Sequence, residues 1–367
     1  MRPAPLRFFL LLLLLPWPAA MAGEATPPGQ PATGPGGADY THARVGQHST
    51  GEGADDVVIF WPEQPMPAGP LPLVVFTHGW GAVKPEHYLA WIHHLVRKGA
   101  IVLYPRYQAD LRAKPDTFTA SAVAGVRRGL DWLAKNKERP QPDPTRLATV
   151  GHSAGGVLAA NLAVELPKAG LPAPKAVMSV EPGITRNAKG ETLLPLADLL
   201  KIAPTTLLLV VTGEDDELVA DRDGRRIYEE STAVPSAQKD WLELQSDDHG
   251  EPALEATHRA PAAPLPGYEP PQRREPKGFL RKRIAKKARE RMAERGLDLE
   301  AASQEPAVTD ALDYHGTWKL FDALRDAAFD GKNRDIALGG GEAQLAMGAW
   351  SDGTPVKPMK RLSAGQQ

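Results

Sequence analysis

The sequence contains no cysteine, which excludes disulfide bonds, thiolate zinc sites, iron–sulfur clusters and a cysteine nucleophile. Neither sign of charge dominates: the formal net charge is −2, so composition gives no reason to expect nucleic acid as a partner. No stretch beyond the N-terminus reaches the roughly 18 apolar residues that a membrane-spanning helix needs. What is present, 42% hydrophobic and 24% charged residues, is ordinary for a globular protein. The 367 residues allow two domains or one large α/β domain.

Residues 1–22 have the pattern of a secretory signal peptide. Arg2 and Arg7 supply positive charge, Phe8–Leu15 is a short apolar run, and Ala20–Ala22 is a small-x-small cleavage site. Eight apolar residues cannot cross a hydrocarbon core of about 30 Å as a helix. We therefore expect an exported protein, periplasmic or extracellular and soluble after cleavage, followed at residues 23–39 by a disordered linker rich in Pro and Gly.

Between residues 40 and 350, short apolar segments alternate with amphipathic ones. The apolar runs predict strands at Val57–Trp61, Leu71–Thr77, Ile101–Tyr104, Leu147–Val150, Ala176–Val180, Thr206–Thr212 and Trp241–Leu244. Helical spacing of apolar residues predicts helices at His87–Lys98, Thr117–Asn136, Gly155–Leu166 and Asp310–Phe329. This alternation is typical of an α/β fold with a mostly parallel central sheet and helices on both faces. The carboxyl ends of such strands are where ligand sites lie.

One of these strand ends carries a candidate nucleophile. The strand Leu147–Val150 runs into Gly151-His152-Ser153-Ala154-Gly155, and a helix follows at once, so G-x-S-x-G stands in the strand–turn–helix context that it requires. A side chain at either glycine would collide with the neighbouring strand and helix. We therefore predict Ser153 as the nucleophile. His152 cannot be its base, because adjacent residues on such a turn point apart.

A second strand end provides part of a candidate oxyanion hole. The strand Leu71–Thr77 is followed by His78-Gly79-Trp80-Gly81. In this architecture one donor is the backbone N–H after the nucleophile, here Ala154, and the other comes from this loop, where Trp80 is the candidate. Each such donor stabilises the transition state by roughly 3 kcal/mol.

The candidate acid lies after the strand Thr206–Thr212, in the segment Gly213 to Val219. Four consecutive acidic residues occur there, and the G-x-x-D-x-x-V spacing measured from Gly213 selects Asp216. Asp215 is the nearest alternative. Glu181, directly after the strand Ala176–Val180, is another.

The candidate base follows the strand Trp241–Leu244, in the segment Asp247-Asp248-His249-Gly250. We predict that His249 removes the proton of Ser153 while Asp216 fixes its tautomer. The chain order Ser153, Asp216, His249 is the one expected when a G-x-S-x-G elbow carries the nucleophile. His258 and His315 remain alternatives for the base.

These segments resemble the α/β-hydrolase superfamily. The segments HGWG (His78 to Gly81), GHSAG (Gly151 to Gly155), GEDDELV (Gly213 to Val219) and DDHG (Asp247 to Gly250) are most similar to the secreted branch around dienelactone hydrolases, cutinase-like polyester hydrolases and platelet-activating-factor acetylhydrolases. The resemblance implies an α/β-hydrolase fold, a triad of Ser153, Asp216 and His249, and Trp80 and Ala154 as oxyanion donors. The paired cysteines that often brace secreted polyester hydrolases are missing, which argues against that substrate class.

A basic, Pro-rich insertion interrupts the hydrolase pattern at about residues 260–306. From Arg273 to Arg295 there are 11 Lys or Arg and 3 Glu, a local net charge of +8. Leu280, Ile284, Ala288 and Met292 recur every four residues, which favours a helix with a thin apolar stripe. The segment is either a solvated excursion or a basic lid that contacts an anionic membrane or cell-envelope polymer weakly.

Together these observations predict one hydrolase domain at residues 40–350 and a C-terminal tail at residues 351–367. The expected activity is hydrolysis of a small-molecule or lipid-like carboxylic ester through an acyl-enzyme intermediate, without metal or cofactor. A peptidase or amidase using the same residues, and a binding protein that keeps the fold without turnover, are the alternatives.

Overall fold

The computed structural model of the protein describes residues 24–51, 53–110, 113–187, 189–267 and 307–363. The predicted signal peptide lies outside these residues, as does the basic helix predicted within the insertion. Within the described ranges, no helix combines the length and the apolar character that crossing a membrane requires.

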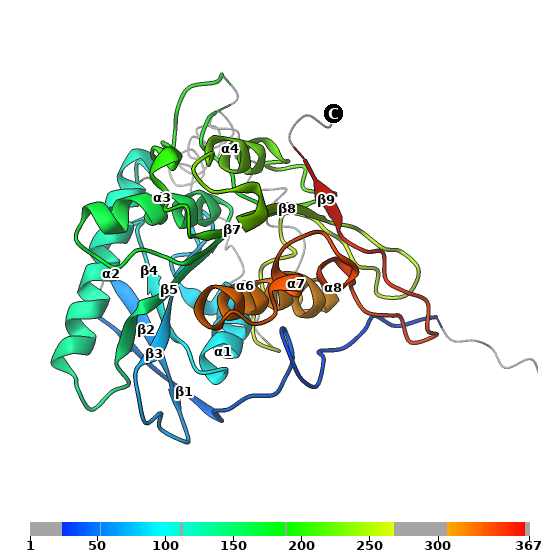
Figure 1. Cartoon of the computed structure of the whole chain (residues 1–367), viewed down its shortest axis with the longest axis horizontal. Helices are drawn as coiled ribbons and strands as arrows, with labels where there is room; N and C mark the ends of the chain where they lie inside the picture. Colours follow the sequence, from blue (N-terminus) through cyan, green and yellow to red (C-terminus); the bar gives the residue numbers. More distant parts are fainter. Residues whose placement is uncertain (1–23, 52, 111–112, 188, 268–306, 364–367) are drawn as a thin grey trace, which may run out of the picture.

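The described residues contain one nine-stranded sheet with the order β1-β2-β4-β3-β5-β6-β7-β8-β9 (Figure 1). Neighbours from β4 to β8 pair in parallel, whereas β1, β2 and β9 join antiparallel at the two edges. The prediction of a mostly parallel α/β sheet is therefore confirmed. The strands are β1 (Arg44–Ser49), β2 (Val57–Glu63), β3 (Leu71–Thr77), β4 (Ile101–Pro105), β5 (Pro142–His152), β6 (Ala176–Val180), β7 (Leu207–Gly213), β8 (Lys239–Leu244) and β9 (Lys360–Leu362).

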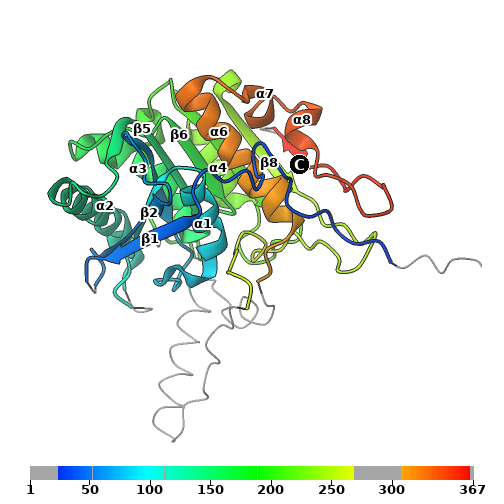
Figure 2. The same ribbon diagram turned by 90° about the horizontal axis from the view of Figure 1, so that it is seen from below.

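Helices cover both faces of this sheet (Figures 1 and 2). Helices α1 (Leu89–Arg97) and α6 (Trp318–Asp330) pack on one face, and α2 (Phe118–Lys135), α3 (Ala154–Lys168) and α4 (Arg222–Glu230) pack on the other. The shorter helical segments are η1 (Pro85–Tyr88), η2 (Pro115–Thr117), η3 (Leu199–Lys201), η4 (Ser236–Gln238), the π-helical η6 (Leu312–Thr317), α7 (Arg334–Ala337) and α8 (Glu342–Leu345).

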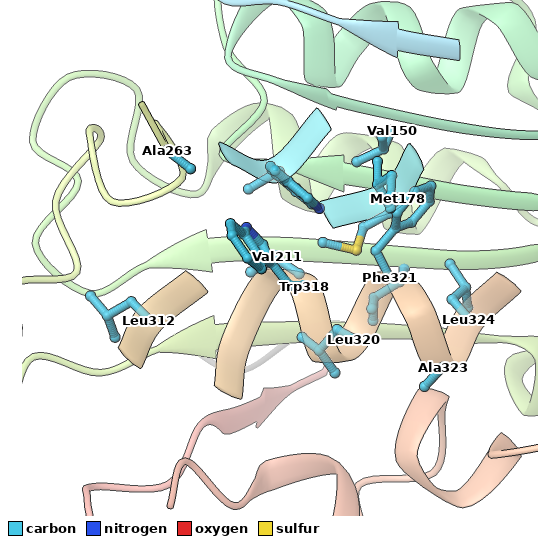
Figure 3. Packing of buried hydrophobic residues seen from close by; sticks show 14 of the residues in the cluster. Val150, Met178, Val211, Ala263, Leu312, Trp318, Leu320, Phe321, Ala323 and Leu324 are labelled. Carbon is cyan, nitrogen blue, oxygen red and sulfur yellow. The ribbon is translucent and has the colours of Figure 1, made fainter. Parts of the chain in front are cut away.

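Burial on both faces explains why the central strands are apolar throughout. Along β3, Val74 and Phe76 pack with the α1 and α6 side, whereas Leu73 and Val75 pack with the α2 and α3 side. Figure 3 shows the α6 layer, where Trp318 and Phe321 lie near strand residues such as Val150, Met178 and Val211. Each such buried side chain stabilises the fold by about 1.5–3 kcal/mol. This packing holds the carboxyl ends of β5, β6 and β7 side by side.

The prediction of a disordered linker is wrong for its described part, because residues 24–39 lie against the domain. The backbone N–H of Gly36 donates to Asp322 Oδ2 on α6 at 3.0 Å. Gln30 Nε2 donates to Tyr40 Oη at 2.9 Å, and Glu251 N–H donates to the carbonyl of Ala25 at 2.8 Å. Specific hydrogen bonds thus fix residues 24–39 on the domain, although their high Pro and Gly content predicts a disordered segment.

The C-terminal boundary also differs from the prediction. Strand β9 pairs antiparallel with β8, with Trp241 opposite Leu362. Val356 and Met359, just before this strand, are 2% exposed. The segment predicted as a tail therefore continues the domain to residue 363 and covers the β8 edge of the sheet.

Asp322 is the buried anion that ties the N-terminal segment to α6. Its carboxylate contacts His94 Nε2 at 2.8 Å, Arg325 at 2.6 Å and Lys98 at 3.7 Å. Burial alone would raise the pKa of Asp322, but the contact with His94 and the charges of Arg325 and Lys98 hold it well below its usual range. The carboxylate is thus ionised and paired, an arrangement that is costly to break on one side only.

We expect Asp322→Asn to lower the free energy of unfolding by about 3–5 kcal/mol at about pH 7, because it takes away the carboxylate that pairs with the buried Arg325. A lowered folded-state pKa stabilises the protein above the unfolded value, near 3.8, and that contribution disappears as pH falls below it. The difference between the variants in urea unfolding should therefore shrink in acid. Asp330→Asn, which breaks the half-exposed pair with Arg146 on the same helix, is the control and should cost less than about 1 kcal/mol. A pH-independent difference for Asp322→Asn would contradict the ion-pair explanation.

Candidate active site

Ser153 occupies a strained turn between β5 and α3. Its φ of 59° and ψ of −124° lie outside the ordinary regions for a residue with a side chain. Its backbone N–H donates to the carbonyl of Val180 at 3.0 Å, and its own carbonyl accepts from Gly183 at 3.2 Å. The end of β6 therefore holds the turn in place, and Ser153 itself is 4% exposed.

The glycines beside Ser153 are required by close packing, as the sequence predicts. A Cβ atom at Gly151 would overlap Thr77 Oγ1 and the carbonyl of Gly155. A Cβ atom at Gly155 would overlap the carbonyl of Thr77 at the end of β3. The turn can form at this strand end only because neither residue has a side chain.

A hydrogen-bonded chain connects Ser153 to one histidine and one carboxylate. His258 Nε2 lies 3.0 Å from Ser153 Oγ, and His258 Nδ1 lies 2.8 Å from Asp216 Oδ2. Asp216 follows β7, and its Oδ1 accepts the backbone N–H groups of Leu218 and Val219, both at 3.0 Å. With Nδ1 donating to Asp216, Nε2 is free to accept the hydroxyl proton of Ser153.

The structure does not bring His249, the predicted base, to Ser153. His249 Nε2 contacts Asp352 Oδ2 at 2.8 Å, and its side chain is 36% exposed. After β8 the chain makes an excursion closed by two backbone hydrogen bonds between Asp247 and Leu254, at 2.8 and 2.9 Å. His249 lies within this excursion, so His258 reaches the elbow instead. The prediction of His249 beside Ser153 is wrong for this reason.

Asp215 and His315, which the sequence also allows as acid and base, lie in different surroundings. Asp215 is exposed and accepts a hydrogen bond from Ser246 Oγ, whereas Asp216 is 4% exposed. His315 Nε2 lies 3.0 Å from the carbonyl of Gly29 in the N-terminal segment. Of the three candidate acids, the structure places Asp216 and Glu181 against His258.

Trp80 and Ala154, the predicted oxyanion donors, lie in the loop after β3 and directly after Ser153. The loop after β3 approaches closely, since a Cβ atom at Gly79 would lie 3.5 Å from Ser153 Cβ. Among the described residues, neither the Trp80 N–H nor the Ala154 N–H donates a hydrogen bond to another group. An oxyanion needs N–H donors that are not already engaged, so both groups remain available, and their role as oxyanion donors stays a prediction. The Trp80 ring packs against Phe118, with ring centroids 5.2 Å apart.

Three buried polar side chains that the sequence analysis did not combine adjoin this chain of contacts. Tyr88 Oη accepts the Gly79 N–H at 3.0 Å and lies 2.9 Å from His152 Nδ1. His152 Nε2 lies 3.3 Å from Glu181 Oε2. Burial, with the nearby His258, lowers the pKa of His152 well below its usual value, so this imidazole is neutral. No sequence signal joins these residues, because they come from separate elements.

His152, Glu181 and His258 can also hold a metal ion. Each offers one ligand atom, and these atoms lie within 4.8 Å of one another. Two imidazoles and a carboxylate are ligands that Zn²⁺ accepts. His258 Nδ1, however, already contacts Asp216, so a metal at this place would compete with that hydrogen bond.

Comparison with known proteins supports the α/β-hydrolase fold. Residues 74–200 match a family described as alpha/beta hydrolase fold. Over 108 residues the chain is 30% identical to Esterase LipI of Mycobacterium tuberculosis, covering 29% of this chain and 32% of that protein. Over 104 residues it is 31% identical to versiconal hemiacetal acetate esterase of Dothistroma septosporum, covering 27% and 30%.

Another match is to methylphloroacetophenone synthase of Cladonia uncialis, which is 27% identical over 165 residues. That match covers 42% of this chain and 6% of the synthase. The chain therefore spans about a third or less of the length of the curated relatives that it matches. The sheet order, the serine elbow and the match over residues 74–200 together show that the chain has an α/β-hydrolase fold.

Proposed function

We propose that the protein hydrolyses carboxylic esters, with Ser153 as nucleophile, His258 as general base and Asp216 as the acid that orients His258. The observation that carries this proposal is the continuous contact from Ser153 Oγ through His258 to Asp216. Two relatives with esterase in their names support an ester rather than an amide substrate. A peptidase or amidase on the same residues is the second candidate.

In the proposed reaction, Ser153 Oγ attacks the ester carbonyl as its proton passes to His258 Nε2. The backbone N–H groups of Trp80 and Ala154 stabilise the negative charge on the carbonyl oxygen. His258 then protonates the leaving alcohol, and an acyl-enzyme remains on Ser153. Water activated by His258 releases the acid and restores the serine.

Export remains a proposal carried by the sequence of residues 1–22. We infer that the signal peptide is removed and that the enzyme meets its ester outside the cytoplasm. Mass determination of the mature N-terminus tests this, and retention of residues 1–22 would contradict it. Weak contact of the basic insertion with an anionic membrane likewise stays a prediction from the sequence.

The test of the proposed activity is a series of p-nitrophenyl esters of increasing acyl length, with the matching p-nitroanilides, in the presence and absence of EDTA. We expect the protein to hydrolyse the esters faster than the matching anilides, after both rates are corrected for the uncatalysed reactions. EDTA should leave the rate of ester hydrolysis unchanged, because Ser153 and His258 generate the nucleophile without a metal. Faster relative turnover of anilides would favour the amidase. Loss of activity in EDTA that Zn²⁺ restores would contradict the mechanism.

A further inference from the structure

The loop after β3, which carries the Trp80 N–H, forms a tight turn. The backbone N–H of Ala82 donates to the carbonyl of Gly79 at 3.1 Å and closes a turn from Gly79 to Ala82. Gly81, at the third position of this turn, has a φ of 81°, and Trp80 before it has no positive φ. This combination is the type II turn, which differs from type I in the direction of the central peptide. The form of the turn therefore depends on how the peptide between Trp80 and Gly81 is held.

Gln108 holds this central peptide. Its Oε1 accepts the Gly81 N–H at 2.8 Å, and the residue has no exposed surface. Gln108 follows β4, the strand that pairs with β3, so the contact joins two adjacent strand ends. Tyr107, the residue before it, donates from Oη to the carbonyl of His78. Among the described residues Gln108 Nε2 has no hydrogen-bond partner, so the side chain is bound to the rest of the protein through its contact with Gly81.

The N–H groups on either side of Trp80 are both engaged by side chains. The Gly79 N–H donates to Tyr88 Oη at 3.0 Å, and the Gly81 N–H donates to Gln108. The Trp80 N–H between them donates to no other group within the described part of the chain. The turn thus leaves one N–H group available and fixes its two neighbours, as a preorganised donor requires.

We propose that Gln108 is a positioning residue for the oxyanion hole. By accepting the Gly81 N–H it keeps the turn in the type II form, and so keeps the Trp80 N–H directed at the carbonyl oxygen of the substrate. The proposal rests on the proposed function, in which Trp80 donates to that oxygen. A hydrogen-bond acceptor is required at position 108, because a side chain without one leaves the Gly81 N–H unpaired and removes the preference for this form of the turn. Gln108 acts on the reacting atoms only through the backbone of the turn.

The test replaces Gln108 by methionine, which has a similar length but only a weak acceptor. It measures kcat and KM for a p-nitrophenyl ester and Ki for an alkyl trifluoromethyl ketone. Ser153 Oγ adds to the carbonyl of this ketone as its proton passes to His258, and the negative oxygen then occupies the oxyanion hole. We expect kcat to fall by about 10- to 100-fold and Ki to rise by the same factor, with KM within about threefold of the wild type, because the lost interaction is made only to the oxyanion.

Two variants separate positioning from general destabilisation. Gln108→Glu keeps an oxygen acceptor for the Gly81 N–H and should restore kcat and Ki to within a few-fold of the wild type. Gln344→Met is the matched control, because Gln344 on α8 is also a buried glutamine whose Oε1 accepts a glycine N–H, that of Gly340 at 2.6 Å. It should lower the melting temperature as Gln108→Met does, but leave kcat and Ki unchanged.

Gly81→Ala tests the same turn if Gln108→Met fails to fold. A Cβ atom disfavours the φ of 81° at this position, so the variant should favour the type I form. We expect the same pattern, a lower kcat and a higher Ki at nearly constant KM. Where both variants fold, the double variant Gly81→Ala, Gln108→Met should lose little more than the slower single variant, because both changes act on one turn.

A folded Gln108→Met variant with kcat and Ki both within about threefold of the wild type would overturn the positioning role. Equal kinetic losses in Gln344→Met, or a Gln108→Glu variant as slow as Gln108→Met, would overturn it too. A raised KM at unchanged kcat would do the same, because it marks an interaction made equally in the ground state. Failure of the proposed function looks different, since the wild type itself would then neither hydrolyse the esters nor bind the ketone.

Discussion

Replacement of His258 by alanine should lower kcat for ester hydrolysis by about 10⁴- to 10⁶-fold, because it removes the only group placed to accept the Ser153 proton within the described residues. His249→Ala should change kcat by no more than a few-fold, since His249 is partly exposed and paired with Asp352. Both are single histidine truncations after β8, so each is the matched control of the other. Thermal unfolding monitored alongside kcat shows whether either variant is merely unfolded.

The opposite pattern, a large loss for His249→Ala and a small one for His258→Ala, would mean that the segment after β8 rearranges to place His249 at Ser153. Comparable large losses in both, with intact folding, would mean that Asp352 and His249 support the site indirectly. The first result would contradict the contacts described for Ser153, His258 and Asp216, whereas the second would contradict only the expectation that His249 is dispensable.

Replacement of Ser153 by alanine should lower kcat by a similar factor of about 10⁶, because the nucleophile is lost while the oxyanion donors remain. Thermal stability should change little, since within the described residues the Ser153 hydroxyl makes a single hydrogen bond, to His258. The double variant Ser153→Ala, His258→Ala should be no slower than either single variant, because residues that act as one unit do not lose activity additively. A further loss of the same size in the double variant would show that His258 acts independently of Ser153.

The apolar strands and the serine elbow were predictable because burial on both faces leaves a strong pattern. Strands β3 and β6 begin and end at the predicted residues. The glycines around Ser153 were predictable for a steric reason, and the structure shows the overlap that a side chain would cause. In both cases local sequence alone carries the physical constraint.

Elements at the edges and surface were missed because their sequences are polar. Strand β1 (RVGQHS) is largely exposed and is specified by pairing with β2. Helix α4 (RDGRRIYEE) buries little beyond Asp223, Gly224 and Ile227. The N-terminal segment is held by contacts with residues far along the chain, Asp322 among them. The spacing of apolar residues within a short segment does not reveal such long-range contacts.

The choice between His249 and His258 could not be made from the sequence for a related reason. The DDHG segment stands directly after the last predicted strand, where a base is expected, whereas His258 follows a stretch without periodicity. The pairing of Asp247 with Leu254 determines which histidine returns to the strand ends. That pairing depends on backbone hydrogen bonds and on the contact of Asp247 with Trp350, from a distant part of the chain.

The central claim, that Ser153 is an activated nucleophile, is tested most directly by covalent labelling with a fluorophosphonate and mass mapping of the modified residue. The account predicts a single adduct on Ser153, formed rapidly in the wild type and in His249→Ala, and suppressed in His258→Ala. An adduct on another residue, or full ester turnover by a protein that the probe does not label, would contradict it.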